Sequence, residues 1–186
     1  VFYNIGRILL VEAALLVLPA IGAIIYGENT LTAFALTIAA LTAAGLTAIR
    51  KKPKKNTIYA KDGYVIVALT WILMSLFGAL PFFISGYIPN FVDAFFETVS
   101  GFTTTGSTIL REIESLPKSL LFWRSFTHWI GGMGILVFVI AIMPKTESTS
   151  MHVMRAEVPG PTVGKLVSKL RASARILYGI YCILTA

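Results

Sequence analysis

The sequence has little charge and almost no cysteine. Of its 186 residues only 13% are charged, whereas 56% are hydrophobic, and the mean hydropathy is +0.78. So low a charge argues against an ordinary soluble domain, and therefore against a soluble enzyme. Disorder is excluded as well, because disordered chains are poor in hydrophobic residues and 12% of this chain is aromatic. The single cysteine, Cys182, can form no internal disulfide and offers no thiol cluster for zinc or iron–sulfur chemistry.

Long apolar stretches dominate instead. A helix needs about 20 apolar residues to cross a hydrocarbon layer about 30 Å thick. Four stretches are long enough, namely Ile8–Tyr26, Leu31–Ile49, Tyr64–Ser85 and Leu120–Met143. A fifth, Ile176–Ala186, is too short, and because the chain starts at Val1 and stops inside this run we expect a piece of a longer protein. The sequence therefore predicts an all-α integral membrane protein.

The basic residues predict how these helices are oriented. The formal net charge is +7, and most basic residues lie in two blocks, one after the second apolar stretch and one after the fourth. The positive-inside rule puts both blocks in the cytoplasm, so the N-terminus lies inside, and Gly27–Thr30 and Gly86–Ser119 lie outside the cytoplasmic membrane. The blocks either set orientation alone or also contact lipid headgroups or a partner. Nucleic acid is not indicated, since no aromatic residues interleave with the basic ones. The blocks are Arg50, Lys51, Lys52, Lys54, Lys55 and Lys61, and then Lys145, Arg155, Lys165, Lys169, Arg171 and Arg175.

A short helix and a polar strand lie between the third and fourth apolar stretches. Phe91–Ser100 has apolar residues at helical spacing, with Asn90 as its N-cap, and would be about 15 Å long, half a membrane. Gly101–Thr108 (GFTTTGST) follows and is rich in glycine and hydroxyl groups. This order predicts a re-entrant pore loop, because non-helical backbone at membrane depth must be buried in protein or line a water-filled path. An ordinary extracellular turn is the alternative.

The polar strand has the features of a cation filter. A potassium ion gives up its water only where a ring of oxygens replaces the hydration shell. The sequence TTGST overlies the potassium-channel pattern TVGYG, and glycine at its third place permits dihedrals that turn successive carbonyls toward one axis. The short helix also directs the negative end of its dipole at the ion path. We therefore predict potassium binding at Thr104, Thr105, Gly106 and Ser107, with Thr104 and Thr105 as the metal ligands, and ion permeation rather than enzyme chemistry.

Three sequence motifs resemble those of a known family. Phe95–Thr108 (FFETVSGFTTTGST), Phe122–Gly134 (FWRSFTHWIGGMG) and Ala141–Pro144 (AIMP) closely resemble the first pore-forming repeat of the TrkH/KtrB superfamily of bacterial potassium uptake proteins, nearest to its TrkH branch. Arg155–Pro161 (RAEVPGP) resembles the cytoplasmic connector before the second repeat of that family. The resemblance implies four helix–pore loop–helix repeats around one pore, two additional N-terminal helices, a homodimer in lipid and a cytosolic nucleotide-binding regulatory subunit. It implies potassium as the substrate and no organic cofactor.

The same resemblance divides the chain. Residues 1–62 would be the two accessory helices with their basic loop, and 63–144 the first repeat. Residues 145–175 would be the connector, and 176–186 the start of the second repeat. The amphipathic pattern of Val163–Leu177 itself predicts an interfacial cytoplasmic helix, with docking of a regulatory partner as the alternative. Thr104, Thr105 and Gly106 fall where the family's first repeat supplies filter oxygens, with Ser107 next. A cation-coupled secondary transporter of another family, with broken helices, is the alternative function.

Several polar residues inside apolar stretches need partners. Arg124 either reaches the outer interface beside Trp123 or pairs with Glu97 and supports the loop from behind. His128 and Ser107 could suggest a protease dyad, but no GxSG-type nucleophile turn is present, and we expect His128 to bond across a helix contact.

Other residues inside these stretches carry structural expectations. Glu12 is predicted near the cytoplasmic interface, within reach of Arg7 or headgroups. Close helix packing is predicted for Gly131, Gly132 and Gly134, and a kink of the third helix at Pro81.

Overall fold

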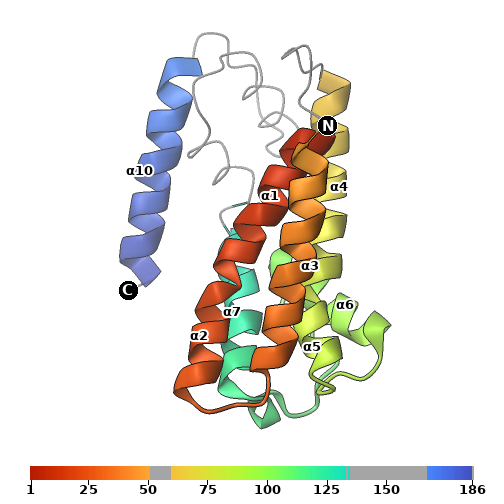
Figure 1. Cartoon of the computed structure of the whole chain (residues 1–186). Helices are drawn as coiled ribbons and strands as arrows, with labels where there is room; N and C mark the ends of the chain where they lie inside the picture. The colour runs from red at the N-terminus through yellow and green to blue at the C-terminus, as the bar shows by residue number, and fades with distance from the viewer. Residues whose placement is uncertain (51–59, 133, 135–166, 186) are drawn as a thin grey trace. The chain divides into compact units, whose positions relative to one another are not determined.

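The structure, a computed structural model, describes residues 1–50, 60–132, 134 and 167–185 (Figure 1). All regular secondary structure in these ranges is helical, which confirms the all-α prediction. The elements are α1 (Phe2–Leu15), α2 (Val17–Ile25), α3 (Leu31–Ile49), α4 (Ala60–Gly78), α5 (Leu80–Ile84), α6 (Phe91–Phe102), the 3-10 turn η1 (Ile113–Ser115), α7 (Lys118–Gly132) and α10 (Val167–Thr185).

Three helical stretches among the described residues are long and apolar enough to cross a membrane: Phe2–Ile25, Leu31–Ile49 and Asp62–Ile84. They agree with the first three predicted spans. The first begins at Phe2 rather than Ile8, because backbone hydrogen bonding continues through the polar residues that lower hydropathy there. Of the fourth predicted span, α7 covers the beginning, and residues 133 and 135–143 lie outside the described residues. Four of the six residues of the first basic block and three of the six of the second lie outside them as well.

The chain forms two compact units. The larger comprises Phe2–Lys52 and Leu69–Gly132, and the smaller comprises Val1, Pro53–Ala68 and Met133–Ala186. In the smaller unit α10 includes the apolar helical run Ile176–Thr185. Its helix starts at Val167, inside the predicted amphipathic stretch, and the first residues of that stretch are not described. The predicted division into accessory helices, repeat and connector stays a prediction.

Small residues let α1 and α3 pack closely in the larger unit. A Cβ added to Gly6 would lie 2.8 Å from both the Ala48 Cβ and the Gly45 carbonyl oxygen, so the two backbones approach as only small residues allow. Phe34 and Leu41 on α3 are fully buried. The predicted accessory pair is thus a tightly packed helix pair.

The third span is interrupted at Ala79, between α4 and α5. Pro81 has no N–H to donate to the carbonyl of Phe77, and this missing hydrogen bond accounts for the break. The kink predicted at this proline is thus confirmed. The carbonyl oxygen of Gly78 instead accepts a hydrogen bond from Trp123 Nε1 on α7 at 2.9 Å. Trp123 is fully buried and meets Phe102 edge to face, with ring centroids 6.3 Å apart. These contacts join α4, α6 and α7 around one aromatic core.

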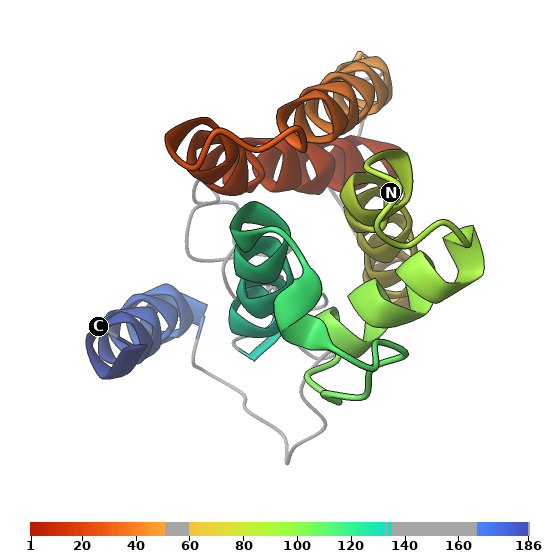
Figure 2. The same ribbon diagram turned by 90° about the horizontal axis from the view of Figure 1, so that it is seen from below.

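The short helix α6 contacts both α5 and α7 (Figure 2). Asn90 caps it as predicted: the Asn90 backbone is extended, and its Oδ1 accepts a hydrogen bond from the Val92 N–H at 3.0 Å. The helix runs two residues beyond the predicted end, to Phe102, where the backbone turns into the polar strand.

Candidate functional site

The polar strand begins with a tight hydrogen-bonded turn at the end of α6. The N–H of Thr104 donates to the Gly101 carbonyl at 2.9 Å, and the N–H of Thr105 donates to the Ser100 carbonyl at 3.0 Å. This pair of bonds defines a Schellman motif, in which the residue after the C-cap is left-handed. Thr104 holds that place with φ of 56°. Since β-branched residues rarely adopt this region, the turn is strained at a predicted ion ligand.

Gly106 is the second left-handed residue of the strand, with φ of 77°. A Cβ added there would meet no atom within 4 Å, so the requirement for glycine comes from backbone conformation alone. Within the described part of the chain, the carbonyl oxygens of Thr104, Thr105 and Gly106 accept no hydrogen bond. Three successive carbonyls are therefore available to a ligand.

Ser107 differs from these three residues. Its carbonyl oxygen accepts a hydrogen bond from the Ser100 hydroxyl at 2.6 Å and so points back toward α6. The hydroxyls of Thr103 and Thr105 lie 2.8 Å apart and share a hydrogen bond. The strand is thus held to α6 on one side, and ion binding by Ser107 stays a prediction.

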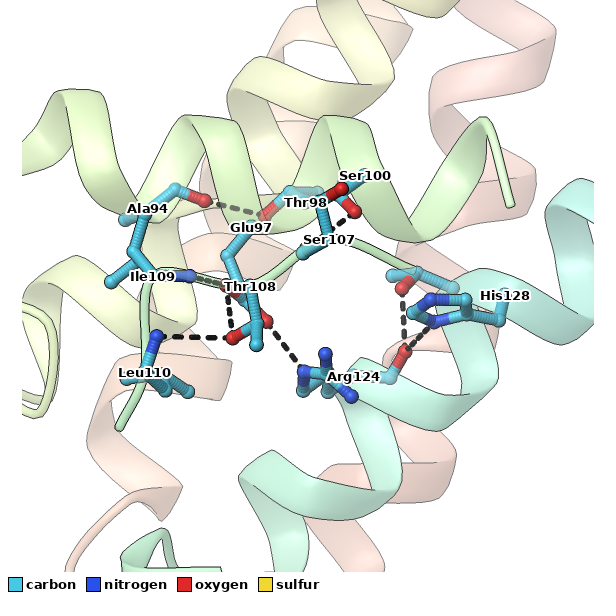
Figure 3. A network of polar contacts seen from close by, with 11 residues as sticks. Ala94, Glu97, Thr98, Ser100, Ser107, Thr108, Ile109, Leu110, Arg124 and His128 are labelled. Atoms are coloured by element: carbon cyan, nitrogen blue, oxygen red, sulfur yellow. Dashed lines mark hydrogen bonds and ion pairs between the residues drawn. The ribbon is translucent and has the colours of Figure 1, made fainter. Parts of the chain in front are cut away.

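Glu97 holds the other end of the strand (Figure 3). Its carboxylate is only 1% exposed. Oε1 accepts a hydrogen bond from Arg124 Nε at 2.5 Å, and Oε2 accepts from Thr108 Oγ1 at 2.9 Å and from the Ile109 N–H at 3.2 Å. Of the two arrangements considered for Arg124, the pair with Glu97 is the one found, and the arginine side chain is 14% exposed. One carboxylate therefore joins α6, α7 and the end of the strand.

The C-terminus of α6 packs directly on α7. A Cβ added to Gly131 would lie 2.0 Å from the Phe102 carbonyl oxygen, which confirms close packing at this glycine. His128 packs at the α6 contact as expected, with Nδ1 3.6 Å from a Cβ added to Gly101, but its hydrogen bond is not the expected one across that contact: Nδ1 lies 2.9 Å from the Arg124 carbonyl oxygen, one turn earlier on the same helix. The ring reaches this oxygen because residues four apart share a helix face. At Gly131 the α6 backbone thus lies directly against α7, beside the side-chain contacts of Glu97 and Phe102 with this helix.

The chain that carries this loop is similar to known transport proteins. A family model described as TrkH, cation transport protein, matches residues 27–186. The chain belongs to the TrkH family of cation transport proteins. This confirms the resemblance drawn from the sequence motifs.

The relatives of this TrkH-family chain are longer than it is. The chain is 37% identical over 185 residues to the Trk system potassium uptake protein TrkH of Salmonella typhimurium, covering 97% of this chain and 38% of that protein. It is 36% identical to the protein of the same name from Vibrio parahaemolyticus, with the same coverage. The crystal structure of the potassium transporter TrkH from Vibrio parahaemolyticus matches with a TM-score of 0.77 and 32% identity, over 100% of this chain and 37% of that one. The chain thus spans less than two fifths of these relatives.

Glu28, in the connection between α2 and α3, caps α7 from a distance. It accepts hydrogen bonds from the Lys118 N–H at 2.7 Å, the Ser119 N–H at 3.1 Å and the Ser119 hydroxyl. Burial raises the pKa of the Glu28 carboxyl, but hydrogen bonds from Ser119, Lys118 and Thr30 act in the opposite direction and together hold that pKa below its usual value. Pro117 precedes α7 and has no side-chain oxygen to accept hydrogen bonds from the first N–H groups of that helix. This residue was the signal in the sequence that a distant acceptor must cap α7.

The same contact brings the two predicted external segments together. Thr30 Oγ1 and Ser119 Oγ lie 2.8 Å apart and share a buried hydrogen bond. The start of α3 and the start of α7 therefore lie at the same end of the larger unit, as a four-span topology requires.

The expectation for Glu12 is wrong. The side chain is fully buried, and neither carboxylate oxygen has a hydrogen-bond partner among the described residues. It contacts neither Arg7 nor a surface, because α1 packs with this residue toward the α4–α6 contact: a Cβ added to Gly78 would lie 3.4 Å from Glu12 Oε1. Burial of this kind depends on helices far along the chain and is not visible in hydropathy.

Proposed function

We propose that this chain is the N-terminal part of a potassium-translocating subunit, and that Thr104, Thr105 and Gly106 supply carbonyl oxygens to its selectivity filter. One observation carries the proposal: three successive carbonyls, which accept no hydrogen bond from the described residues, lie on a strand whose Thr104 and Gly106 are both left-handed. Carbonyl rings replace the hydration shell of potassium in filters of this kind. One such loop is a quarter of a ring, and the resemblance to the family implies that three further repeats complete it.

The supports of the strand explain how it could keep its shape while ions pass. The Schellman turn orients its first residue, and Glu97 holds Thr108 and Ile109 at its end. The negative end of the α6 dipole lies at the start of the strand and favours a cation there. Potassium is the cargo, and the residues of the strand need to bind and release it without covalent chemistry.

The surroundings of the subunit follow the family. We propose that the N-terminus lies inside, in the cytoplasmic membrane, and that Gly27–Thr30 and Gly86–Ser119 face outside. A homodimer and a cytosolic nucleotide-binding regulatory subunit are part of the same proposal. The hydrogen bond from the Ser119 N–H to Glu28 supports this topology, because it joins the two segments that are proposed to face outside.

Gly106→Ala in the full-length protein tests the filter. A Cβ in the left-handed region costs about 1–2 kcal/mol, so carbonyls that turn away to relieve it should weaken potassium affinity by roughly tenfold and reduce selectivity over sodium. Gly86→Ala is the matched control, because Gly86 also has positive φ (78°) and open space around a Cβ, but lies in the α5–α6 connection. Rubidium and sodium uptake would be measured at equal membrane expression.

The two variants distinguish backbone strain in the proposed filter from the same strain elsewhere in the chain. Gly86→Ala should lower stability and leave ion selectivity unchanged. If Gly106→Ala expresses normally and keeps both potassium affinity and selectivity, the strand is not the filter.

A further inference from the structure

Glu12 on α1 is a buried acid that the proposed filter does not use. Its side chain is fully buried, and both carboxyl oxygens have no hydrogen-bond partner in the part of the chain that the structure describes. Buried polar groups in proteins are almost always hydrogen bonded, so an acid without a partner calls for an explanation.

The position of this carboxyl relates it to α6. Oε1 lies 3.4 Å from a Cβ added to Gly78, and the same Cβ would lie 2.9 Å from Thr98 Cγ2 and 3.2 Å from Phe102 Cε2. Thr98 and Phe102 belong to the C-terminal half of α6, and Phe102 precedes the strained Thr104 by two residues. The acid therefore lies behind the helix that begins the proposed filter strand.

Two donors around Gly78 are already engaged. The Thr98 hydroxyl donates to the Ala94 carbonyl at 2.9 Å, and Trp123 Nε1 donates to the Gly78 carbonyl at 2.9 Å. A carboxylate at Glu12 would be an anion in an apolar interior that no hydrogen bond from the described residues stabilises. A neutral carboxylic acid carries no such charge.

Among the described residues of the larger unit, no counter-charge compensates for a carboxylate there. In the larger unit, α3, α5 and the Leu69–Gly78 part of α4 carry no titratable side chain. On α1 itself, Arg7 lies five residues earlier, about 140° around the helix from Glu12. On α6 and α7, which pack against Gly78, Arg124 is paired with Glu97. The remaining titratable groups of the packed elements are Tyr3, Tyr26, Asp93, Lys118 and His128.

We propose that Glu12 is a proton-binding site: it holds a proton at neutral pH, and release of that proton at alkaline pH puts an uncompensated negative charge behind α6 and lowers uptake. The ligand is a single proton, exchanged between water and one carboxyl group. The effect on uptake rests on the proposed potassium transport, whereas the protonation state does not.

Infrared spectroscopy of the full-length protein in lipid tests the proton directly. The difference spectrum between the protein and its Glu12→Gln variant at neutral pH should contain the carbonyl stretch of a protonated carboxylic acid, and this band should disappear as pH rises. Glu114→Gln is the matched control, because Glu114 is exposed and should contribute no such band. Absence of the band at neutral pH overturns the proposal.

Rubidium uptake as a function of pH tests the consequence. We expect uptake by the unchanged protein to fall with alkaline pH by at most tenfold per pH unit, as release of one proton requires, and the Glu12→Gln profile to match it at neutral pH and stay flat. An alkaline fall that persists in Glu12→Gln, or loss of neutral uptake at normal expression, overturns the proposal. If Glu12→Gln does not fold, Glu12→Met supplies the neutral variant. An infrared band together with no potassium or rubidium uptake by any form contradicts the proposed function and leaves the proton site standing.

Discussion

Glu12 and Glu97 are both buried acids, yet their surroundings are opposite. Glu97 accepts hydrogen bonds from Arg124, Thr108 and Ile109, whereas Glu12 accepts none among the described residues. Burial penalises the charged form of both carboxyls, but only Glu97 recovers that cost through a cation and two further donors. Equal burial therefore permits a structural ion pair in one place and calls for a neutral acid in the other.

The cause of the difference is the helix that each acid faces. Glu97 on α6 faces Arg124 on α7 and the returning polar strand, which supply N–H and O–H groups. Glu12 on α1 faces the Gly78 backbone, whose carbonyl already serves Trp123. Removing the partner of Glu97 and neutralising each glutamate in turn should therefore have unequal effects.

Removing Arg124 should have the largest effect. Arg124→Gln leaves the Glu97 carboxylate buried without its cation, which should reduce the free energy of unfolding by about 3–5 kcal/mol. Thermal unfolding of the full-length protein in detergent would measure this. A loss below about 1 kcal/mol, the value of an exposed pair, would show that Glu97 does not depend on Arg124.

Neutralising Glu97 should cost less. Glu97→Gln keeps a hydrogen-bond acceptor, and the arginine that loses its partner is 14% exposed and can turn toward water, so we expect a loss of about 1.5–3 kcal/mol. The double variant Glu97→Gln/Arg124→Gln should lose less than the sum of the single losses. Strict additivity in the same unfolding assay would mean that the two side chains act independently.

Glu28 provides a third, partly exposed carboxylate, and Glu28→Gln should cost about 1 kcal/mol through loss of the α7 cap. The pKa of Glu28 is lowered on folding, so its stabilisation is present above the usual glutamate range of about 4.3 and is lost as pH falls through the folded value. The stability difference from Glu28→Gln should therefore shrink in acid and persist at neutral pH. A difference that grows toward low pH would contradict this sign.

Neutralising Glu12 should have the smallest effect. If the acid is already neutral, Glu12→Gln replaces one neutral group with another of similar size, and the free energy of unfolding at neutral pH should change by less than about 0.5–1 kcal/mol. The same unfolding assay measures it. A loss as large as that of Arg124→Gln would indicate a charged, partnered Glu12 and remove the contrast with Glu97.

Local features of the chain were predictable from single stretches of sequence. Apolar runs indicated three of the observed spans, Asn90 indicated the start of α6, and Pro81 indicated the break between α4 and α5. Each depends on residues within a few positions of one another, through hydropathy, capping or a missing N–H. The left-handed backbone at Gly106 was expected for the same reason, whereas a threonine in that conformation at position 104 was not.

The pairing of distant side chains could not be derived in this way. Glu97 and Arg124 are 27 residues apart, and the sequence left two arrangements for the arginine. Glu28 and Lys118 are 90 residues apart, and Glu12 was expected near a surface. Propensity and periodicity describe which face of a helix is apolar, but which donor meets which carboxylate depends on how α1, α6 and α7 pack. Membrane class, helix positions and family motifs thus came from composition and local pattern, while the charge state available to each buried acid was decided by packing, because partners outweigh burial only when tertiary contacts bring them within hydrogen-bonding distance.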